Sequence, residues 1–213
     1  MKLRKSLLKK SQLYLILDRP EFNGFSWKKI SGLVLTKKVG LIQLRDKISS
    51  KADLLKIARK YAQYLASTQT LFIVNDYVDL AVACGADGVH LGQEDLSLKQ
   101  ARMILGQAKI IGVSCHSLAQ ALKAQKAGAD YIGIGPVYTT PTKPEYKPIG
   151  LKILRQLKNR IKIPYYAIGD IHAGNIKEVL AAGARRVAVC RAILRASDYK
   201  RAAGQLNKEL KKI

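Results

Sequence analysis

Long apolar segments and closely spaced cysteines are missing from this chain of 213 residues. No apolar run approaches the roughly 18 residues that a membrane-spanning helix needs, so we expect no membrane span. The basic segment Met1–Lys10 holds only the pair Leu7-Leu8 and has no apolar core of signal-peptide length. The three cysteines, Cys84, Cys115 and Cys190, form no zinc or redox spacing. The default expectation is therefore a reducing cytoplasm.

Acidic residues are also scarce. The 15 Asp and Glu are set against 38 Lys and Arg, which gives a formal net charge of +23. Such a surface attracts nucleic acids, anionic lipids or anionic small molecules. The charges are dispersed, apart from concentrations at Lys2–Lys10 and Lys200–Lys212, and no aromatic residues are interleaved with them to stack bases. We expect no specific nucleic-acid partner, and favour a solvated basic surface around a site for phosphorylated small molecules.

Short apolar segments alternate with amphipathic segments along the chain. Several of the short segments are apolar almost throughout, which is typical of parallel strands covered on both faces. The segments between them carry apolar stripes with the helical period, for example Leu54, Ala58, Tyr61, Ala62 and Leu65. The eight predicted strands are Gln12–Leu17, Gly40–Leu44, Thr70–Asn75, Gly88–Leu91, Lys109–Ser114, Tyr131–Pro136, Pro164–Gly169 and Arg186–Cys190.

Eight strand–helix units predict an α/β fold, a single-domain (β/α)8 TIM barrel over residues 1–213, with residues 1–10 as a basic N-terminal extension. A weak repeat supports this, because Gly85-Ala86-Asp87, Gly128-Ala129-Asp130 and Gly183-Ala184-Arg185 each separate a helix from a strand. A doubly wound open sheet is the alternative, but no Gly-x-Gly-x-x-Gly follows the first strand. In a barrel, functional residues lie at the carboxyl ends of the strands.

Carboxylates follow the third and fourth predicted strands. Asn75-Asp76 ends the third strand, and Asp95 follows the fourth within Gly92-Gln93-Glu94-Asp95. If these strands are parallel neighbours, both carboxylates emerge at the same end of the sheet. Two hard oxygen ligands suit Mg²⁺, which takes its other ligands from water and substrate phosphates. Asp after a strand is also a typical helix N-cap, and the pattern alone leaves both interpretations open.

The second strand ends in Gln43-Leu44-Arg45-Asp46-Lys47. Strand alternation sends Gln43, Arg45 and Lys47 to one side, where two cations and an amide could hold a multiply charged anion. Arg grips phosphate oxygens bidentately, whereas Lys acts as a point charge. An exposed basic turn is the alternative.

Hydroxyl groups and a lysine follow the fifth and sixth strands. Ser114 could donate a hydrogen bond to a ligand or cap a helix, and His116 could act as an acid or base or be structural. We expect Cys115 to be a small buried filler, since no partner base is evident. The segment Thr140-Pro141-Thr142-Lys143 is rich in groups that donate hydrogen bonds to an anion. Its loop, which extends to about Ile149, is long enough to act as a lid.

The seventh and eighth strands end at Gly169 and Arg191, where barrels often bind phosphate. Gly169 lets a phosphate approach the backbone, whereas a carboxylate at Asp170 would repel one. Two charges about 4 Å apart interact by roughly 4 kcal/mol at an effective dielectric constant near 20, so Arg191 could offset that charge. We therefore hypothesise that Asp170 and Arg191 form a compensating pair.

Taken in order, these motifs resemble the thiamine phosphate synthase family over nearly the whole chain. The resemblance implies a Mg²⁺-dependent transferase with a (β/α)8 barrel. It would join 4-amino-2-methyl-5-hydroxymethylpyrimidine diphosphate to 4-methyl-5-(2-phosphoethyl)thiazole, releasing thiamine monophosphate and pyrophosphate. The motifs are Gln43–Lys47, Asn75-Asp76, Gly88–Asp95, Gly112–Ser114, Gly133–Pro136, Thr140–Lys143 and Ala167–Gly169.

The resemblance also implies roles for these residues. The implied contacts of the pyrimidine diphosphate are Gln43, Arg45, Lys47, Asn75 and Ser114. Leu44 and Asp46 are further implied substrate-binding residues. Asp76 and Asp95 would hold Mg²⁺ against the pyrophosphate. The implied contacts of the thiazole phosphate are Thr140, Pro141, Thr142, Gly169, Cys190 and Arg191. Arg45, Lys47 and Lys143 are the implied catalytic cations, with Lys143 on the pyrophosphate, and no side chain is assigned as a general base.

Two positions depart from the family pattern, which usually has Gly where Asp170 stands and often Ser where Arg191 stands. Two rival functions also remain. A thiazole tautomerase shares the barrel but lacks the metal-binding carboxylates, and His116 is compatible with it. A non-catalytic barrel that binds a phosphorylated ligand is the other rival. The oligomeric state is left open, and a homodimer is compatible with the sequence.

Overall fold

Eight parallel strands close into a barrel in the computed structural model, which describes residues 2–21, 27–36, 38–142 and 145–212. Each strand pairs with the next along the chain, and the first pairs with the last. The strands are β1 Leu13–Asp18, β2 Leu41–Arg45, β3 Leu71–Asn75, β4 Gly88–Leu91, β5 Ile110–Cys115, β6 Tyr131–Ile134, β7 Tyr165–Ala167 and β8 Val187–Val189. The predicted (β/α)8 barrel and its eight strands are confirmed.

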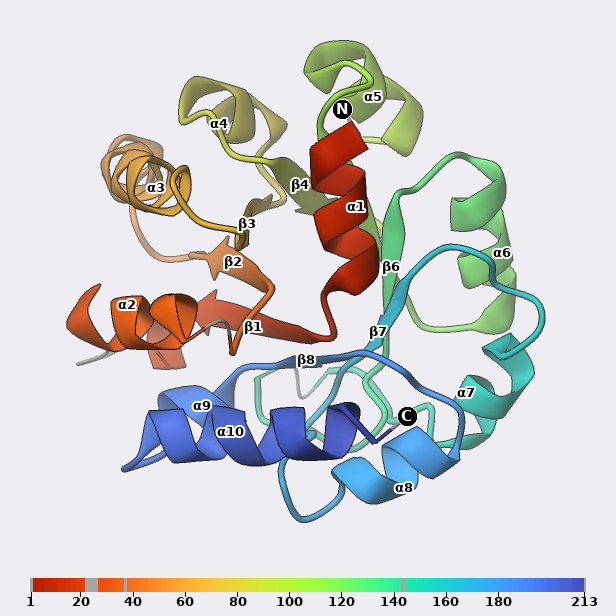
Figure 1. Ribbon diagram of the computed structural model, residues 1–213. Coiled ribbons are helices and arrows are strands. Elements are labelled where there is room, and N and C mark those ends of the chain that lie inside the picture. Colours follow the sequence, from red (N-terminus) through yellow and green to blue (C-terminus); the bar gives the residue numbers. More distant parts are fainter. Residues whose placement is uncertain (1, 22–26, 37, 143–144, 213) are drawn as a thin grey trace.

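Helices surround the barrel on its outer side (Figure 1). They are α2 Trp27–Leu35, α3 Lys51–Leu65, α4 Val78–Ala83, α5 Leu98–Leu105, α6 Leu118–Lys126, α7 Lys152–Leu157, α8 Ile176–Ala181, α9 Arg191–Leu194 and α10 Tyr199–Leu210, with a 3-10 turn at Arg19–Glu21. The stripe predicted on α3 is the buried face of that helix, where Leu54, Ala58 and Tyr61 pack in the core. None of the helices in the described ranges combines the length and apolar character that crossing a membrane requires.

The core has two layers, as strand alternation requires. The outer layer lies between strands and helices and includes Leu15, Ile42 and Val74. The inner layer fills the barrel and includes three fully buried tyrosines, Tyr14, Tyr131 and Tyr166. Their rings pack edge to face with centroids 5.2 to 5.8 Å apart. The barrel interior is therefore closed below the site by aromatic rings.

The basic segment at the start of the chain forms helix α1, Lys2–Lys10, which lies across one end of the barrel (Figure 1, red). Its Leu8 is 2% exposed and belongs to the inner layer of the core. Arg4 and Lys5 form ion pairs of 2.6 and 2.9 Å with Asp87 and Asp130, the acidic residues of the repeat that precedes β4 and β6. The predicted extension is thus a helix that covers the amino end of the barrel.

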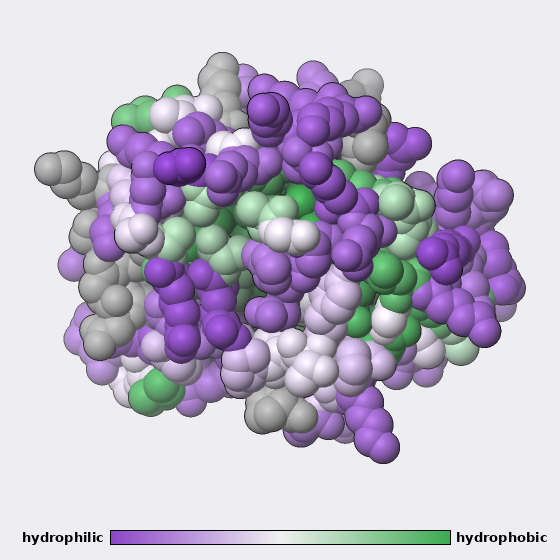
Figure 2. Space-filling view, turned by 90° about the horizontal axis from the view of Figure 1, so that it is seen from below, coloured by the Kyte–Doolittle hydropathy of each residue, from purple (hydrophilic) through white to green (hydrophobic). Residues whose placement is uncertain are grey.

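The second concentration of positive charge lies on α10, where Lys200, Arg201 and Lys208 are exposed while Ala203 and Leu206 are buried. On the face that Figure 2 shows, hydrophilic side chains cover most of the surface, with smaller apolar areas between them. The basic side chains of α10 therefore lie on its exposed face, while its apolar side chains pack in the core.

Candidate active site

A cavity opens at the carboxyl ends of the strands and encloses about 1020 Å³, counted to its open mouth. This is the size of a small-molecule site. All eight strands contribute lining residues, for example Tyr14, Gln43, Asn75, His90, Ser114, Gly133, Tyr166 and Ala188. The cavity therefore occupies the end of the barrel at which the sequence predicts function.

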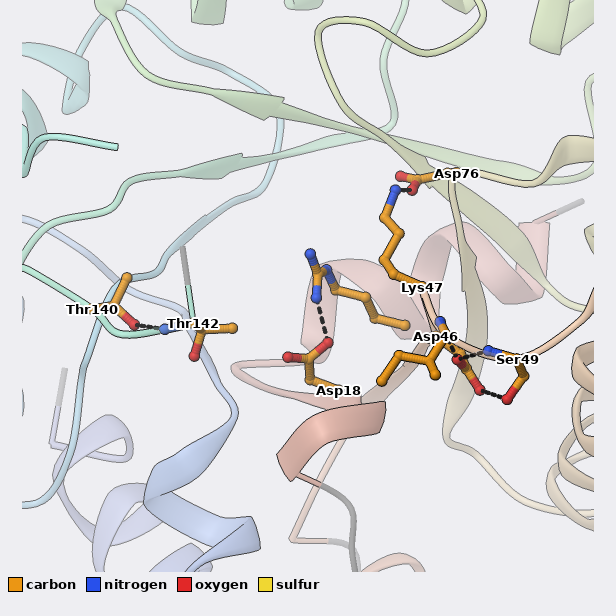
Figure 3. Close-up of polar contacts among 9 residues, drawn as sticks. Asp18, Asp46, Lys47, Ser49, Asp76, Thr140 and Thr142 are labelled. Carbon is orange, nitrogen blue, oxygen red and sulfur yellow. Dashed lines mark hydrogen bonds and ion pairs between the residues drawn. The ribbon is translucent and has the colours of Figure 1, made fainter. Parts of the chain in front are cut away.

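Two carboxylates meet beside this cavity. Asp76 follows β3 with its backbone N–H donating to His90 O at 2.8 Å, and Asp95 accepts from Gly92 N at 2.6 Å. Burial and a hydrogen bond with the Asp95 carboxyl raise the pKa of Asp76 above its ordinary value. Lys47 forms an ion pair with Asp76 (Figure 3). The hydrogen bond with Asp76 in turn raises the pKa of Lys47. Two acidic groups this close attract a cation.

Neither carboxylate caps a helix. Helix α4 begins after Tyr77, and α5 begins after Ser97, whose hydroxyl accepts from Gln100 N. Asp76 also has a φ of 62°, a left-handed conformation that a non-glycine residue rarely adopts. The N-cap interpretation of the sequence is therefore wrong. Strain at an acidic residue beside a cavity is typical of a functional position.

The end of β2 presents an amide and a guanidinium to the cavity. Gln43 and Arg45 line it, as the alternation predicts. Arg45 donates to Asp18 at 2.5 Å, and the Asp18 side chain is only 3% exposed (Figure 3). The ion pair fixes the guanidinium at the wall of the cavity while leaving its other N–H groups for a ligand.

Polar side chains also form a continuous chain through the barrel interior. Gln43 Nε2 donates to the Tyr14 hydroxyl at 2.5 Å, and the hydroxyls of Tyr14 and Tyr131 are 2.8 Å apart. The Tyr131 hydroxyl lies 3.0 Å from His90 Nδ1, and His90 Nε2 lies 2.9 Å from Ser114 Oγ. The chain thus begins and ends at residues that line the cavity.

On the side of β5 and β6, Ser114, His116, Thr140 and Thr142 line the cavity. His116 Nδ1 is 2.6 Å from Gly135 O, and its ring stacks on Tyr146 with centroids 4.4 Å apart. One ring nitrogen of His116 is therefore held by the backbone. Nearby Cys115 is 1% exposed, and burial raises the pKa of its thiol to about 12, which fits a structural filler rather than a nucleophile.

The ends of β7 and β8 combine a close backbone approach with a half-buried cation. Gly169 has a φ of 116°, and a Cβ there would lie 2.5 Å from Val137 N. Arg191 Nη1 lies 3.8 Å from Asp170 Oδ1, so the compensating pair forms as an ion pair. Within the described part of the chain, Nε and Nη1 of Arg191 are buried without a hydrogen-bond partner. Such donors are costly unless a ligand uses them.

A family model described as "Thiamine monophosphate synthase" matches residues 13–193. The chain belongs to this family. A thiamine-phosphate synthase of Shouchella clausii is 42% identical over 93% of this chain and 96% of its own length. One of Gloeobacter violaceus is 51% identical over 74% of this chain, which covers 46% of that longer relative. The solved structure of a thiamine phosphate pyrophosphorylase from Pyrococcus furiosus is 35% identical in sequence, with a TM-score of 0.85 over 99% of this chain and 98% of its own.

Some of the residues that the resemblance to thiamine monophosphate synthases predicts to contact substrate do not line the cavity. Leu44 is 4% exposed and packs in the outer core layer, because its neighbours Gln43 and Arg45 face inward. Pro141 is exposed and is not among the lining residues, and Lys143 lies outside the described residues. The implied side-chain contact is therefore wrong for Leu44 in this conformation, and the role of Lys143 stays a prediction.

Asp46 shapes the loop after β2 rather than facing the cavity. Its carboxylate accepts from the backbone N–H groups of Ile48 and Ser49, both at 2.9 Å, and from the Ser49 hydroxyl at 2.7 Å (Figure 3). Burial by itself would raise the pKa of Asp46, but these hydrogen bonds and the charge of Arg19 outweigh burial and lower it. The loop that Asp46 orders carries Lys47 toward Asp76.

The sequence motifs did not single out Asp18, His90 or the interior tyrosines as part of the site. Alternation along β1 and β4 contains the signal, since Tyr14, Ile16 and His90 all line the cavity. Their polar partners lie on other strands, and only the closed barrel brings these together.

Proposed function

We propose that the protein catalyses the condensation of the aminopyrimidine diphosphate with the thiazole phosphate to give thiamine monophosphate and pyrophosphate. The observation that carries the proposal is the pair of carboxylates Asp76 and Asp95, with Lys47 bound to Asp76, beside a cavity that Arg45 lines. Relatives that match this chain over almost their whole length bear the name of this activity. The expected location is the cytoplasm.

The residues at the mouth fit Mg²⁺. Asp76 and Asp95, whose carboxyls are hydrogen-bonded to each other, would be the protein ligands. Among the described residues, no three His, Cys, Asp or Glu side chains come together as a metal cluster. Mg²⁺ commonly binds through one or two carboxylates and completes its shell with water and substrate phosphates. Bound there, it would neutralise charge that develops on the departing pyrophosphate.

Cationic side chains would hold the diphosphate of the first substrate. Arg45 is anchored by Asp18 and is therefore preorganised to bind phosphate oxygens. Lys47 would exchange part of its contact with Asp76 for the diphosphate. Lys143 is proposed as a third cation. Gln43, Asn75 and Ser114, which line the cavity, would bind the pyrimidine ring.

The thiazole phosphate would bind at the ends of β7 and β8. Gly169 lines the cavity there, and Arg191 offers buried donors that have no hydrogen-bond partner among the described residues. Asp170 opposes an anion, but the ion pair with Arg191 offsets its charge. Thr140 and Thr142 line the same cavity and would contact the thiazole.

Catalysis would then rest on charge stabilisation and positioning. The bond from the pyrimidine methylene to the diphosphate oxygen breaks, and the amino-substituted ring carries the resulting positive charge. Arg45 and Lys47 stabilise the departing anion, and the loop donors align the thiazole nitrogen for attack on the methylene carbon. No general base is needed, which agrees with His116 Nδ1 being held by Gly135 O.

The test is incubation of the protein with both substrates and Mg²⁺, followed by chromatography of the products. Thiamine monophosphate is expected only when both substrates are present. A tautomerase would instead convert an isomer of the thiazole phosphate alone, without added metal. A non-catalytic barrel would bind the substrates and leave them unchanged. Either result would overturn the proposal.

A further inference from the structure

The orientation of the Gln43 amide gives the interior hydrogen-bond chain its direction. Each tyrosine hydroxyl carries one proton and can also accept hydrogen bonds. The Tyr14 hydroxyl already accepts from Gln43 Nε2. Its own proton therefore points to the Tyr131 oxygen, 2.8 Å away, since the reverse arrangement would leave that proton buried without an acceptor in the chain.

The direction continues through His90. The Tyr131 hydroxyl accepts from Tyr14, so its own proton is donated to His90 Nδ1 at 3.0 Å. A ring whose Nδ1 accepts is the neutral form that carries its proton on Nε2. Nε2 then donates to Ser114 Oγ at 2.9 Å. Burial raises the pKa of both tyrosines, so both stay protonated and able to donate.

The last residue of the hydrogen-bond chain faces the cavity. Once Ser114 Oγ accepts from His90, the serine proton is left to donate elsewhere, and Ser114 lines the cavity. A serine without this constraint can rotate and act as donor or acceptor. The aminopyrimidine ring has unprotonated nitrogen atoms, which are acceptors.

We propose that His90 is a positioning residue whose Nε2-protonated neutral form makes Ser114 a dedicated hydrogen-bond donor to a ring nitrogen of the pyrimidine substrate. The direction is imposed from Gln43 through the two tyrosines. The proposal rests on the proposed function, because it takes the aminopyrimidine as the ligand of the cavity. It adds three residues, Tyr14, Tyr131 and His90, that support binding without needing to touch the reacting atoms.

One measurement on the folded protein needs no substrate. Nitrogen-15 NMR of the folded protein at neutral pH reports which imidazole nitrogen carries the proton. The chain has only 3 His, so comparison with His90→Asn identifies the signals of His90. The expected spectrum is that of the neutral form protonated on Nε2. A spectrum of His90 protonated on Nδ1, or on both nitrogens, would overturn the proposal.

Kinetics of Tyr131→Phe test the consequence for binding. Loss of the hydroxyl breaks its hydrogen bonds with Tyr14 and His90, and should raise KM for the pyrimidine diphosphate about threefold to tenfold while leaving KM for the thiazole phosphate unchanged. The His90 spectrum should change in the same variant. Tyr165→Phe is the matched control, since its hydroxyl donates to Gly183 O at 2.7 Å outside the cavity. An unchanged spectrum and KM in Tyr131→Phe would also overturn the proposal.

Failure of the proposed function and failure of the positioning role of His90 give different results. If the protein forms no thiamine monophosphate while His90 is protonated on Nε2, the proposed function fails and the hydrogen-bond direction stands. If product forms while His90 is protonated on Nδ1, the function stands and the positioning role fails. The wild-type spectrum decides the second point even if Tyr131→Phe does not fold.

Discussion

Replacing Asp95 by Asn is the sharpest perturbation of the carboxylate pair. The substitution removes one negative charge and preserves an oxygen that can still accept from Gly92 N, which is 2.6 Å from Asp95 in the native loop. The loop should therefore keep its shape. What changes is the charge available to a divalent cation beside Asp76.

The magnitude follows from Coulomb's law. Two unit charges about 4 Å apart interact by roughly 1 kcal/mol in bulk water, so a dication and one carboxylate interact by at least about 2 kcal/mol. That corresponds to about a 30-fold change in binding. We expect the Mg²⁺ concentration for half-maximal rate to rise by at least this factor in Asp95→Asn.

The assay is the initial rate of thiamine monophosphate formation as a function of Mg²⁺ concentration. Asp79→Asn is the matched control, because Asp79 is a nearby surface carboxylate, 64% exposed and paired with Lys51. It should titrate like the wild type. If Asp95→Asn had an unchanged Mg²⁺ dependence, the metal assignment would be refuted.

Three further outcomes are expected. Arg191→Ala should raise KM for the thiazole phosphate at least tenfold and spare the pyrimidine diphosphate, since its buried donors lack other partners among the described residues. Arg45→Met should lower the free energy of unfolding by about 3 kcal/mol in urea titrations, because Asp18 is left buried and unpaired. Lowering the pH should weaken the binding of Mg²⁺, first through protonation of Asp76. The raised pKa of Asp76 makes it gain a proton at higher pH than an ordinary Asp, and a protonated carboxyl does not bind metal.

Each of these has a contrary result. A wild-type KM for the thiazole phosphate in Arg191→Ala would contradict the assignment of Arg191 to the phosphate of that substrate. An unchanged urea midpoint in Arg45→Met, checked against an exposed Arg155→Met control, would show that Asp18 needs no partner. A Mg²⁺ dependence that is flat with pH down to the ordinary range of Asp would contradict the role of Asp76.

The barrel was predictable because its signals are local. Each strand is a short apolar run, each helix has an apolar stripe, and the glycines of the repeat mark the turns between them. Helix α1 was not predictable in this way. Its buried anchor Leu8 and its ion pairs with Asp87 and Asp130 become visible only when the barrel is closed.

The candidate site also contains residues that the sequence could predict and residues that it could not. Alternation along β2 correctly sent Gln43 and Arg45 inward, and charge reasoning correctly paired Asp170 with Arg191. The sequence could not separate a cap from a paired carboxylate at Asp76, because that depends on where α4 begins. The hydrogen-bond chain through His90 was equally hidden, since its members lie on five different strands.

The most direct test of the central claim is the amount of pyrophosphate and thiamine monophosphate formed together by the wild-type protein from both substrates. We expect equal amounts of the two products. They should form only with Mg²⁺, and a chelator that removes the metal should abolish their formation. Undiminished product in the presence of the chelator, or no product with Mg²⁺ present, would contradict the central claim.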